Sequence, residues 1–561
     1  PLVVMTTEVF RNMLLRAGAG ERLAGVRLAV LDECHYIGRW DRGTVWEEAI
    51  LSCPVDIQFL ALSATIPNAG HIAGWMDRVH PPTDLVQSDV RTVPLQYYYC
   101  RGGTLRRLNA PTAGAPGRRP PSRRPIHRSS HWEDSEYPSE VVDALYRDDL
   151  LPAIYFLFSR RGCETSLEAC ADLDLLDDDE REAVQEQLGR WKEDYPSLLT
   201  CPFLHLLEQG LAAHHAGMMP AWKLAVERLF QQKLLKVVFA TETLAAGINM
   251  PARSTVISSL RRPGDNGFRD LSFTEFHQMA GRAGRRGMDT SGGVIILADP
   301  RTPRSRAQAY VDGGPEPLGS CFYPGYGLVI HWLANYGSER SYRLVNRGLS
   351  SYGKGANRSE RSGKDSPAWK RFMAARAVLD YYDVLENDKP VGIGKLVAAL
   401  QVENELLAAL VITDALPLEA APPLIAGIAG ALAGSLNRRV GGGPPGAPVR
   451  PLPLRGPLRR SFHAAMGVAN DLEKVQRRCG FLCPTTLSER LAWIASRWAD
   501  GETWESLLDT VDLEEGDVAY SLRSVIDLLQ QISLAPVDPA LRAAAAEARR
   551  RVDRPPVSEI L

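Results

Sequence analysis

The sequence predicts an α/β protein that has two successive parallel-sheet regions followed by a helical region. Short apolar runs alternate with helical stretches twice, within residues 1–100 and again within 136–310. From about residue 374 the apolar residues recur instead at helical spacing. Acidic or hydroxyl residues directly follow several of the apolar runs. A doubly wound sheet has its ligand crevice at this end of its strands, so these residues are the first candidates for a site.

The most informative short segment is Asp32-Glu33-Cys34-His35, which ends the apolar run 26–31. Nucleotide-hydrolysing folds use paired acids after a buried strand to place a magnesium ligand and a base beside the γ-phosphate. The same pattern also occurs where a loop simply enters solvent, so the tetrapeptide needs support from the rest of the chain.

That support comes from five further blocks, which follow in a fixed order. The blocks are 62–65 after the expected strand 57–62, 158–160 after the expected strand 153–158, then 213–217, 239–251 and 278–289. With 32–35, they resemble motifs II, III, IV, IVa, V and VI of superfamily 2 helicases, in the DExH-box branch typified by the superkiller-like RNA helicases. Residues 6–8, Thr-Thr-Glu, resemble motif Ib of that family.

The resemblance covers the chain to about Ile532 and implies two RecA-like domains, the first incomplete, then a winged helix and a carboxy-terminal helical domain. The expected boundaries are 1–100 and 136–310 for the RecA-like domains, 101–135 for a linker, 311–360 for the winged helix, 374–535 for the helical domain and 536–561 for a peripheral tail.

Two of these regions have signals of their own. Residues 101–132 hold eight arginines and no acid among Gly, Pro and Ser, which predicts a surface linker, with an extra phosphate-binding arm as the alternative. In the helical domain Val518, Leu522, Val525, Leu529 and Ile532 are spaced by 4, 3, 4 and 3, the stripe of an amphipathic helix.

The resemblance implies a role for each acidic or imidazole group of motif II. Asp32 would hold Mg²⁺ through the water shell of the ion, and Glu33 would orient and deprotonate the attacking water. His35 would couple the two RecA-like domains. ATP and Mg²⁺ are therefore the expected cofactors.

Motif VI supplies the opposite charge. Ser272-x-x-Glu275 is a capping-box pattern, and a helix starting there would carry Gln278, Arg282 and Arg285 on one face, at i, i+4 and i+7. By resemblance, Gln278 senses the γ-phosphate and the two arginines are arginine fingers that reach across the inter-domain cleft. A surface phosphate- or acid-binding cluster is the alternative for the arginines.

Further residues are assigned to nucleotide, nucleic acid and coupling. Gly247 and Asn249 are expected near the nucleotide. The residues expected to contact a nucleic-acid backbone are Thr6, Thr7, Arg160, His215, Thr241, Glu242 and Thr243. Ser63, Ala64 and Thr65 are expected to link the ATP state to the nucleic-acid groove. A metal at His214-His215 is disfavoured because the flanking Ala and Gly offer no third ligand.

One motif is missing. The family has a phosphate loop, G-x-x-x-x-G-K-[ST], before motif Ib, and none of the pairs Gly353-Lys354, Gly363-Lys364 and Gly394-Lys395 fits it. The chain also begins at Pro1, so we expect an amino-terminally truncated sequence that on its own is impaired in ATP binding. A nucleic-acid-binding scaffold without turnover is the alternative.

Composition sets limits on partners. The net charge of −2 gives no global basic field, so the RNA-binding groove must be local. Arg286-Gly287 after the second arginine finger resembles the RNA-processing branch of the family, which implies single-stranded or partly duplex RNA as partner, with DNA as the alternative. Nine scattered cysteines fit reduced thiols in the cytoplasm, and no membrane segment is apparent.

Only a short polar stretch separates Tyr352 from Ala374, where exosome-associated relatives carry a large insertion, so exosome-type docking is doubtful.

Overall fold

The computed structural model describes every residue except 1, 16–22, 41, 65, 89, 110–136, 246–249, 265–266, 353–365, 434–451, 512 and 560–561. The chain divides into two compact units, each of which is described by itself. The first unit comprises Pro1–Val86, Pro317–Leu513 and Asp517–Ser558; the second comprises Gln87–Glu316, Glu514–Gly516 and Glu559–Leu561.

The first unit contains a small parallel sheet of β1 (Leu28–Leu31) and β2 (Gln58–Ala61), with Leu28 opposite Gln58. The helices around it are α1 (Thr7–Leu15), α3 (Gly43–Ser52) and α4 (Ala69–Val79), with a 3₁₀ turn η1 (Cys34–Gly38) after β1. The run 26–31 was expected to be a buried strand, but Leu28 and Val30 are 50% and 51% exposed. Among the described residues this sheet has only two strands, so β1 is not enclosed as a central strand of a larger sheet would be.

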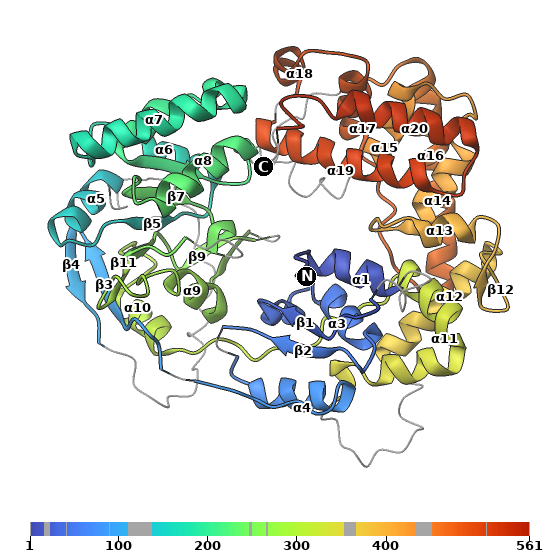
Figure 1. Ribbon diagram of the computed structural model, residues 1–561, viewed down its shortest axis with the longest axis horizontal. Helices are drawn as coiled ribbons and strands as arrows, with labels where there is room; N and C mark the ends of the chain where they lie inside the picture. Colours follow the sequence, from blue (N-terminus) through green and yellow to red (C-terminus); the bar gives the residue numbers. More distant parts are fainter. Residues whose placement is uncertain are drawn as a thin grey trace. The chain divides into compact units, whose positions relative to one another are not determined.

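The second unit, drawn mainly in light blue to green in Figure 1, is built on a seven-stranded sheet with the order β4-β3-β11-β8-β5-β7-β6. Its strands are β3 (Leu95–Arg101), β4 (Thr104–Arg107), β5 (Ala153–Phe156), β6 (Leu211–His214), β7 (Val237–Ala240), β8 (Ser254–Ile257) and β11 (Gly292–Leu297). All neighbours are parallel except β3 and β4. Every residue of β5, β6, β7, β8 and β11 is buried. A parallel sheet covered on both faces requires such apolar strands.

The helices of this unit lie between the strands in the chain. They are α5 (Pro138–Arg147), α6 (Arg160–Glu168), α7 (Asp178–Asp194), α8 (Pro220–Gln231), α9 (Phe273–Ala280) and α10 (Arg304–Asp312). The 3₁₀ turns are η3 (Pro196–Thr200), η4 (Leu204–Gln209) and η5 (Glu242–Ala245). Helices α6 and α8 contact β6, α9 contacts β8 and α10 contacts β3.

The domain boundary expected at residue 100 is wrong. Strand β3 pairs in parallel with β11 along its length, Leu95 opposite Gly292, and β4 pairs with β3. The second unit therefore begins at Gln87, well before the expected boundary, and the expected linker 101–135 begins with a strand. In β3 Tyr97 and Tyr99 are buried and Tyr98 between them is only partly so, which fits a strand packed mainly on one face.

The remaining elements of the first unit are mostly helical. They are α11 (Tyr326–Asn346), η6 (Leu349–Ser351), α12 (Pro367–Tyr381), β12 (Leu385–Glu386), β13 (Lys389–Pro390), α13 (Gly394–Ala399), α14 (Glu405–Asp414), α15 (Pro422–Leu432), α16 (Gly456–Cys479), α17 (Glu489–Ala499), α18 (Trp504–Thr510), α19 (Glu515–Leu534) and α20 (Pro539–Val552). The stripe predicted on α19 is confirmed, since Val518, Leu522, Val525, Leu529 and Ile532 are all buried.

Two boundaries in this part differ from expectation. A winged helix needs a β-hairpin as its wing, and the described part of 311–360 has helix and 3₁₀ turn but no strand; the hairpin β12–β13 follows at 385–390. The tail is not peripheral, because α20 buries Leu541, Ala545, Ala548 and Val552. The indole Nε1 of Trp498 donates to the Val552 carbonyl at 2.8 Å, which ties α20 to α17.

Within the described residues no helix combines the length and the apolarity needed to cross a bilayer.

Candidate nucleotide and nucleic-acid site

The acid loop, residues 32–35, begins where β1 ends. The backbone N–H of Leu62 donates to the Leu31 carbonyl at 2.9 Å, and the N–H of Cys34 donates to the Leu62 carbonyl at 2.8 Å. These two bonds join the loop to the chain segment that follows β2. Motifs II and III, which are separated by 27 residues or more in the sequence, are thus adjacent at the carboxyl ends of neighbouring strands.

Glu33 adopts left-handed backbone, with φ 58° and ψ 41°. Few residues other than glycine do so, and the conformation costs about 1 kcal/mol or more. It turns the chain directly into η1, where Glu33 Oε2 lies 3.2 Å from Nδ1 of His35. Burial lowers the pKa of His35, the charge of Glu33 opposes that shift, and Arg39 adds to it. The imidazole is therefore held neutral near pH 7 beside the carboxylate.

Asp32 has the chemistry that a magnesium ligand requires. It is exposed, and its Oδ1 accepts the N–H of Glu33 at 2.9 Å, which fixes the carboxylate at the strand end. Mg²⁺ is usually held by one or two carboxylates, its own waters and substrate phosphates, so a single oriented carboxylate fits. Among the described residues no group of three or more His, Cys, Asp and Glu side chains is arranged to hold a metal by itself.

The coupling residues lie against the acid loop. Ser63 and Ala64 are exposed and follow directly after Leu62; Thr65 lies outside the described residues. Burial raises the pKa of the Cys34 thiol to about 11, although a side-chain hydrogen bond with Ser63 lowers it in part. Ser63 is thus in contact with motif II through Cys34.

The arginine loop, residues 281–289, follows α9. The predicted capping box is confirmed, since Ser272 accepts the N–H of Glu275 at 3.0 Å and Glu275 Oε2 accepts the N–H of Ser272 at 2.8 Å. The prediction that Gln278, Arg282 and Arg285 share one helical face is wrong. Helix α9 ends at Ala280, and Ala283 forms an isolated bridge with Ala252, so only Gln278 is helical.

The loop that carries the two arginines is nevertheless held firmly. Arg91 donates through Nη2 to the carbonyls of Gly281 and Ala283, each at 2.8 Å. Gly284 has φ 87°, and a Cβ there would lie 2.6 Å from Cγ1 of Val93. Glycine is therefore required by both the backbone conformation and the space.

Arg285 is oriented by a bidentate pair with Asp289. Its Nε and Nη2 lie 2.9 and 2.8 Å from the two carboxylate oxygens, and the backbone N–H of Arg285 also donates to Oδ2. The side chains of Arg285 and Asp289 are 15% and 4% exposed. Two parallel bonds fix a planar guanidinium in one orientation.

A charge network supports the start of α9. Burial alone would raise the pKa of Glu275, but hydrogen bonds from Arg269 and the Ser272 backbone, with the charges of Arg269 and Arg262, outweigh burial and lower the pKa to about 2. Arg262 also pairs with Glu242 of motif V at 2.5 Å. Motifs V and VI therefore share one set of ion pairs.

The expected nucleic-acid contacts have mixed outcomes. Thr6 is exposed before α1 and its Oγ1 accepts the N–H of Val9 at 3.4 Å, while Thr7 begins the helix and is half-buried. A helix start with hydroxyl groups and free N–H donors suits a phosphate. Arg160 is paired with Glu514 at 2.7 Å, so its charge is already compensated.

His215 does not offer an exposed contact, contrary to expectation. It is 1% exposed and its Nε2 lies 3.2 Å from Glu164. Its neighbour His214 is paired with Glu227 at 2.9 Å. Both rings brace the end of β6, and a direct role for His215 in binding a strand is not supported.

Motif V is only partly described. Thr241 is 9% exposed, and its N–H donates to the His214 carbonyl at 3.3 Å. Glu242 is committed to Arg262, and Thr243 is placed in η5. The two residues expected near the nucleotide, Gly247 and Asn249, lie outside the described residues.

Sequence reasoning missed a hairpin between motifs V and VI. Strands β9 (Arg261–Gly264) and β10 (Gly267–Asp270) pair antiparallel, and Phe268 on β10 is 65% exposed. In the sequence, the dipeptide Asn266-Gly267 is a strong hairpin signal, and it could have been used to predict this hairpin.

Each unit brings its own set of predicted residues together. Asp32, Glu33, His35 and Ser63 gather in the first unit; Gln278, Arg282 and Arg285 lie within one turn and loop of the second.

Comparison with known sequences gives three family matches along the chain. Residues 1–72 match the DEAD/DEAH box helicase family, 193–287 match the helicase conserved C-terminal domain and 387–559 match the DSHCT (NUC185) domain. The last match reaches through α20, in agreement with its packing.

Curated relatives agree with these matches. DExH-box ATP-dependent RNA helicase DExH15 chloroplastic of Arabidopsis thaliana is 38% identical over 59% of this chain and 32% of its own length. Probable helicase HelY of Mycobacterium tuberculosis is 35% identical over 63% and 42%. Exosome RNA helicase MTR4 of Homo sapiens is 34% identical over 59% and 34%. The matched part of this chain thus spans about a third to two fifths of the length of these relatives.

Proposed function

The chain belongs to the superkiller-like DExH-box branch of superfamily 2 helicases, and on that premise we propose that it is part of an ATP-dependent RNA helicase. The proposed motor moves along single strands and unwinds duplexes by coupling ATP hydrolysis to closure of its two RecA-like lobes. RNA is proposed over DNA because two of these relatives carry RNA helicase in their names and because Arg286-Gly287 follows the second arginine of motif VI.

The observation that carries the proposal is the acid loop. An exposed, oriented Asp32, a Glu33 held in strained backbone and a neutral His35 beside it form a site for activating water at a phosphate. When bound, Mg²⁺ supplies charge neutralisation for the phosphate oxygens and for the two adjacent acids. In this proposal Asp32 binds the water shell of the ion, and Glu33 accepts a proton from the attacking water.

Gln278, Arg282 and Arg285 are proposed to bind the γ-phosphate of the same nucleotide. Charge spreads over the equatorial phosphate oxygens during transfer, so positioned guanidinium groups lower the barrier. The bidentate pair with Asp289 occupies Nε and Nη2 of Arg285 and offsets its charge, but it also fixes the guanidinium, so in this role Nη1 would donate to the phosphate.

Contacts to the nucleic acid are proposed at Thr6, Thr7 and Thr241, with the β9–β10 hairpin as the element that separates strands. The exposed aromatic ring of Phe268 supports the last assignment, since bases stack on aromatic faces without sequence preference. A cytoplasmic location is proposed because none of the cysteines forms a disulfide within the described residues.

The test uses the protein as its gene encodes it. Glu33→Gln keeps the size of the side chain but removes the base, so ATP turnover should fall by about 10³-fold while RNA binding persists. Turnover that stays at the level of the unaltered protein would remove Glu33 from this role. Stimulation of ATP turnover by RNA and DNA strands of equal length separates the two substrates.

The second candidate is a nucleic-acid-binding scaffold without turnover. It is favoured by one observation, that none of the Gly-Lys pairs in this chain fits a phosphate loop. Reading the complete gene for G-x-x-x-x-G-K-[ST] decides between the two, because the motor requires that loop.

A further inference from the structure

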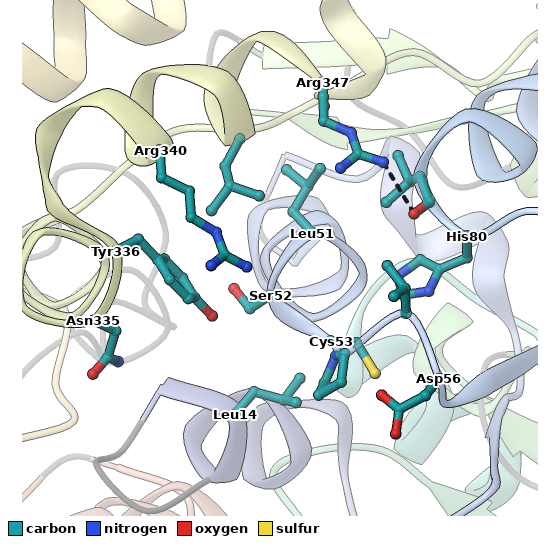
Figure 2. Close-up of a pocket in the computed structure, with 14 residues that line it drawn as sticks. Leu14, Leu51, Ser52, Cys53, Asp56, His80, Asn335, Tyr336, Arg340 and Arg347 are labelled. Atoms are coloured by element: carbon teal, nitrogen blue, oxygen red, sulfur yellow. Dashed lines mark hydrogen bonds between the residues drawn. The ribbon is translucent and has the colours of Figure 1, made fainter. Parts of the chain in front are cut away.

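A cavity of about 490 Å³ lies in the first unit, away from the acid loop. It is lined by the end of α3, the loop that enters β2, the end of α4 and one side of α11 (Figure 2). Asp56 in its wall comes two residues before β2, whereas the acid loop follows β1. Because β1 and β2 are parallel, the cavity and the acid loop lie at opposite ends of the strands.

Two arginines of α11 give the cavity its positive character. The guanidinium of Arg340 lies 4.7 Å from the centre of the Tyr336 ring, and it has no ion pair or hydrogen bond among the described residues. Arg347 donates through Nη2 to the carbonyls of Arg78 and Val79, at 2.7 and 3.1 Å. Its Nε and Nη1 donors are not used in those bonds. Figure 2 shows both side chains extending from the helix toward the lining residues.

The second feature of the cavity wall is a buried histidine, His80. His80 is 6% exposed, and its Nε2 lies 2.8 Å from the carbonyl of Ile50. A carbonyl only accepts, so Nε2 carries the hydrogen and Nδ1 is an acceptor. Among the described residues Nδ1 has no hydrogen-bond partner. Burial lowers the pKa of His80, the bond to Ile50 opposes this, and Arg347 adds to the lowering, so the ring stays neutral.

The rest of the lining fits the body of a small organic molecule. Leu14, Leu51, Val79 and Leu344 supply apolar surface, and the volume lies within the range of small-molecule sites. The carboxylate of Asp56 also lines the cavity, and its charge is opposite in sign to that of the two guanidinium groups. Asp56 is exposed, so solvent screens its charge.

The cavity also adjoins a break in α11. Gly337 has φ 70° and ψ 173°, which interrupts the helix between Tyr336 and Arg340. A ligand that contacts Tyr336 before the break and Arg340 after it, together with α3 and α4, would fix the two halves of α11 relative to the sheet. Binding should therefore stabilise the fold, by an amount that rises with the logarithm of ligand concentration above the dissociation constant.

We propose that this cavity binds a small organic anion, with a phosphate or carboxylate group at Arg340 and Arg347 and an apolar body against the leucine and valine side chains of the wall. Guanidinium groups bind both kinds of anion through paired N–H donors. The proposal concerns a site separate from the acid loop and needs no ATP turnover, so it can fail while the proposed function stands.

The probe is phenyl phosphate, titrated by calorimetry into the full chain, with benzoate, inorganic phosphate and phenol as comparison arms. We expect saturable binding of phenyl phosphate or benzoate, at least tenfold tighter than phenol or inorganic phosphate. The stronger of the two binders identifies the preferred anion. Equal affinity for inorganic phosphate, or no saturable binding of either organic anion, overturns the proposal.

Variants place the binding in the cavity. Arg340→Ala should weaken binding about tenfold or more, because a charge-assisted pair of hydrogen bonds is lost. Arg340→Glu should abolish it. Neither change removes an ion pair of the folded chain among the described residues, so both should fold. The matched control is Arg343→Ala, on the same helix, exposed and paired with Glu339, which should leave binding unchanged.

Two outcomes contradict the proposal directly. Unchanged affinity in Arg340→Ala would place the ligand elsewhere. Displacement of phenyl phosphate by a short single-stranded RNA would assign the cavity to the nucleic-acid path instead of a small molecule.

Discussion

The acid loop and the arginine loop both turn through left-handed backbone, but they do so with different residues. In the arginine loop glycine occupies these positions, Gly284 at φ 87° and Gly287 at φ 76°. In the acid loop the position belongs to Glu33, at φ 58°. Glycine adopts this conformation without strain, whereas a glutamate does so at a cost.

The difference indicates which groups the two loops need for their chemistry. The arginine loop requires a shape that presents Arg282 and Arg285, and glycines at the turns provide it. The acid loop places the carboxylate itself at the turn, so the strain falls on a residue with a proposed catalytic role. Strained backbone concentrates at functional sites because the surroundings hold it in place. Each prediction below tests one side of this comparison.

The largest effect is expected for Gly284→Ala. The added Cβ meets Val93 at 2.6 Å and also requires a left-handed alanine. Overpacking and backbone strain together should destabilise the protein by about 4 kcal/mol and reduce ATP turnover. Urea denaturation measures the loss. Gly287→Ala is the control, since its φ is similar and nothing lies near its Cβ; it should cost only about 1 kcal/mol.

Glu275→Gln should have the next largest effect, with a defined pH dependence. The pKa falls from 4.5 to about 2 on folding, so the ionised group stabilises the protein above about pH 4.5 and that stability is lost as the pH drops toward 2. The shift corresponds to about 3 kcal/mol at neutral pH. Stability of the variant should be flatter across this window. Glu186→Gln, at an exposed pair on α7, should change little.

Arg285→Lys should have a smaller effect on stability, about 1.5 kcal/mol, because lysine keeps the charge but loses the bidentate geometry with Asp289. Expressed as a free energy, the loss of ATP turnover in Arg285→Lys should be larger than the loss of unfolding free energy. A double-mutant cycle with Asp289→Asn measures the coupling. Additive losses would show that the pair does not orient the guanidinium.

The smallest expected change is a gain. Glu33→Gly should stabilise the first unit by about 1 kcal/mol, because strain at φ 58° is relieved, while ATP turnover is lost. Glu33→Ala removes the same carboxylate but retains a Cβ, so it should show no such gain. Equal stability of the two variants would mean that the backbone at residue 33 is unstrained.

The sequence was sufficient where local chemistry decides structure. The capping box at Ser272 and Glu275, the apolar stripe of α19 and the parallel strands after which the motifs lie all follow from spacing and side-chain type. The end of α9 did not follow, because nothing in the arginine spacing reveals the bridge between Ala252 and Ala283 that replaces helical bonding.

Long-range contacts explain the remaining differences. The burial of His215 depends on Glu164 from another helix, and the compensation of Arg160 depends on Glu514, some 350 residues away in the chain. The membership of β3 in the second sheet depends on its register with β11. None of these partners is near in sequence, so no local pattern could identify them.

The placement of β3 and β4 has a practical consequence for anyone who expresses the second lobe alone. A fragment starting at residue 136 would lack both strands and leave Val294 and Ile296 of β11 with a bare hydrogen-bonding edge. Such an apolar edge recruits strands from other molecules, and the fragment should precipitate. Beginning the fragment at Gln87 keeps the edge covered by its own chain.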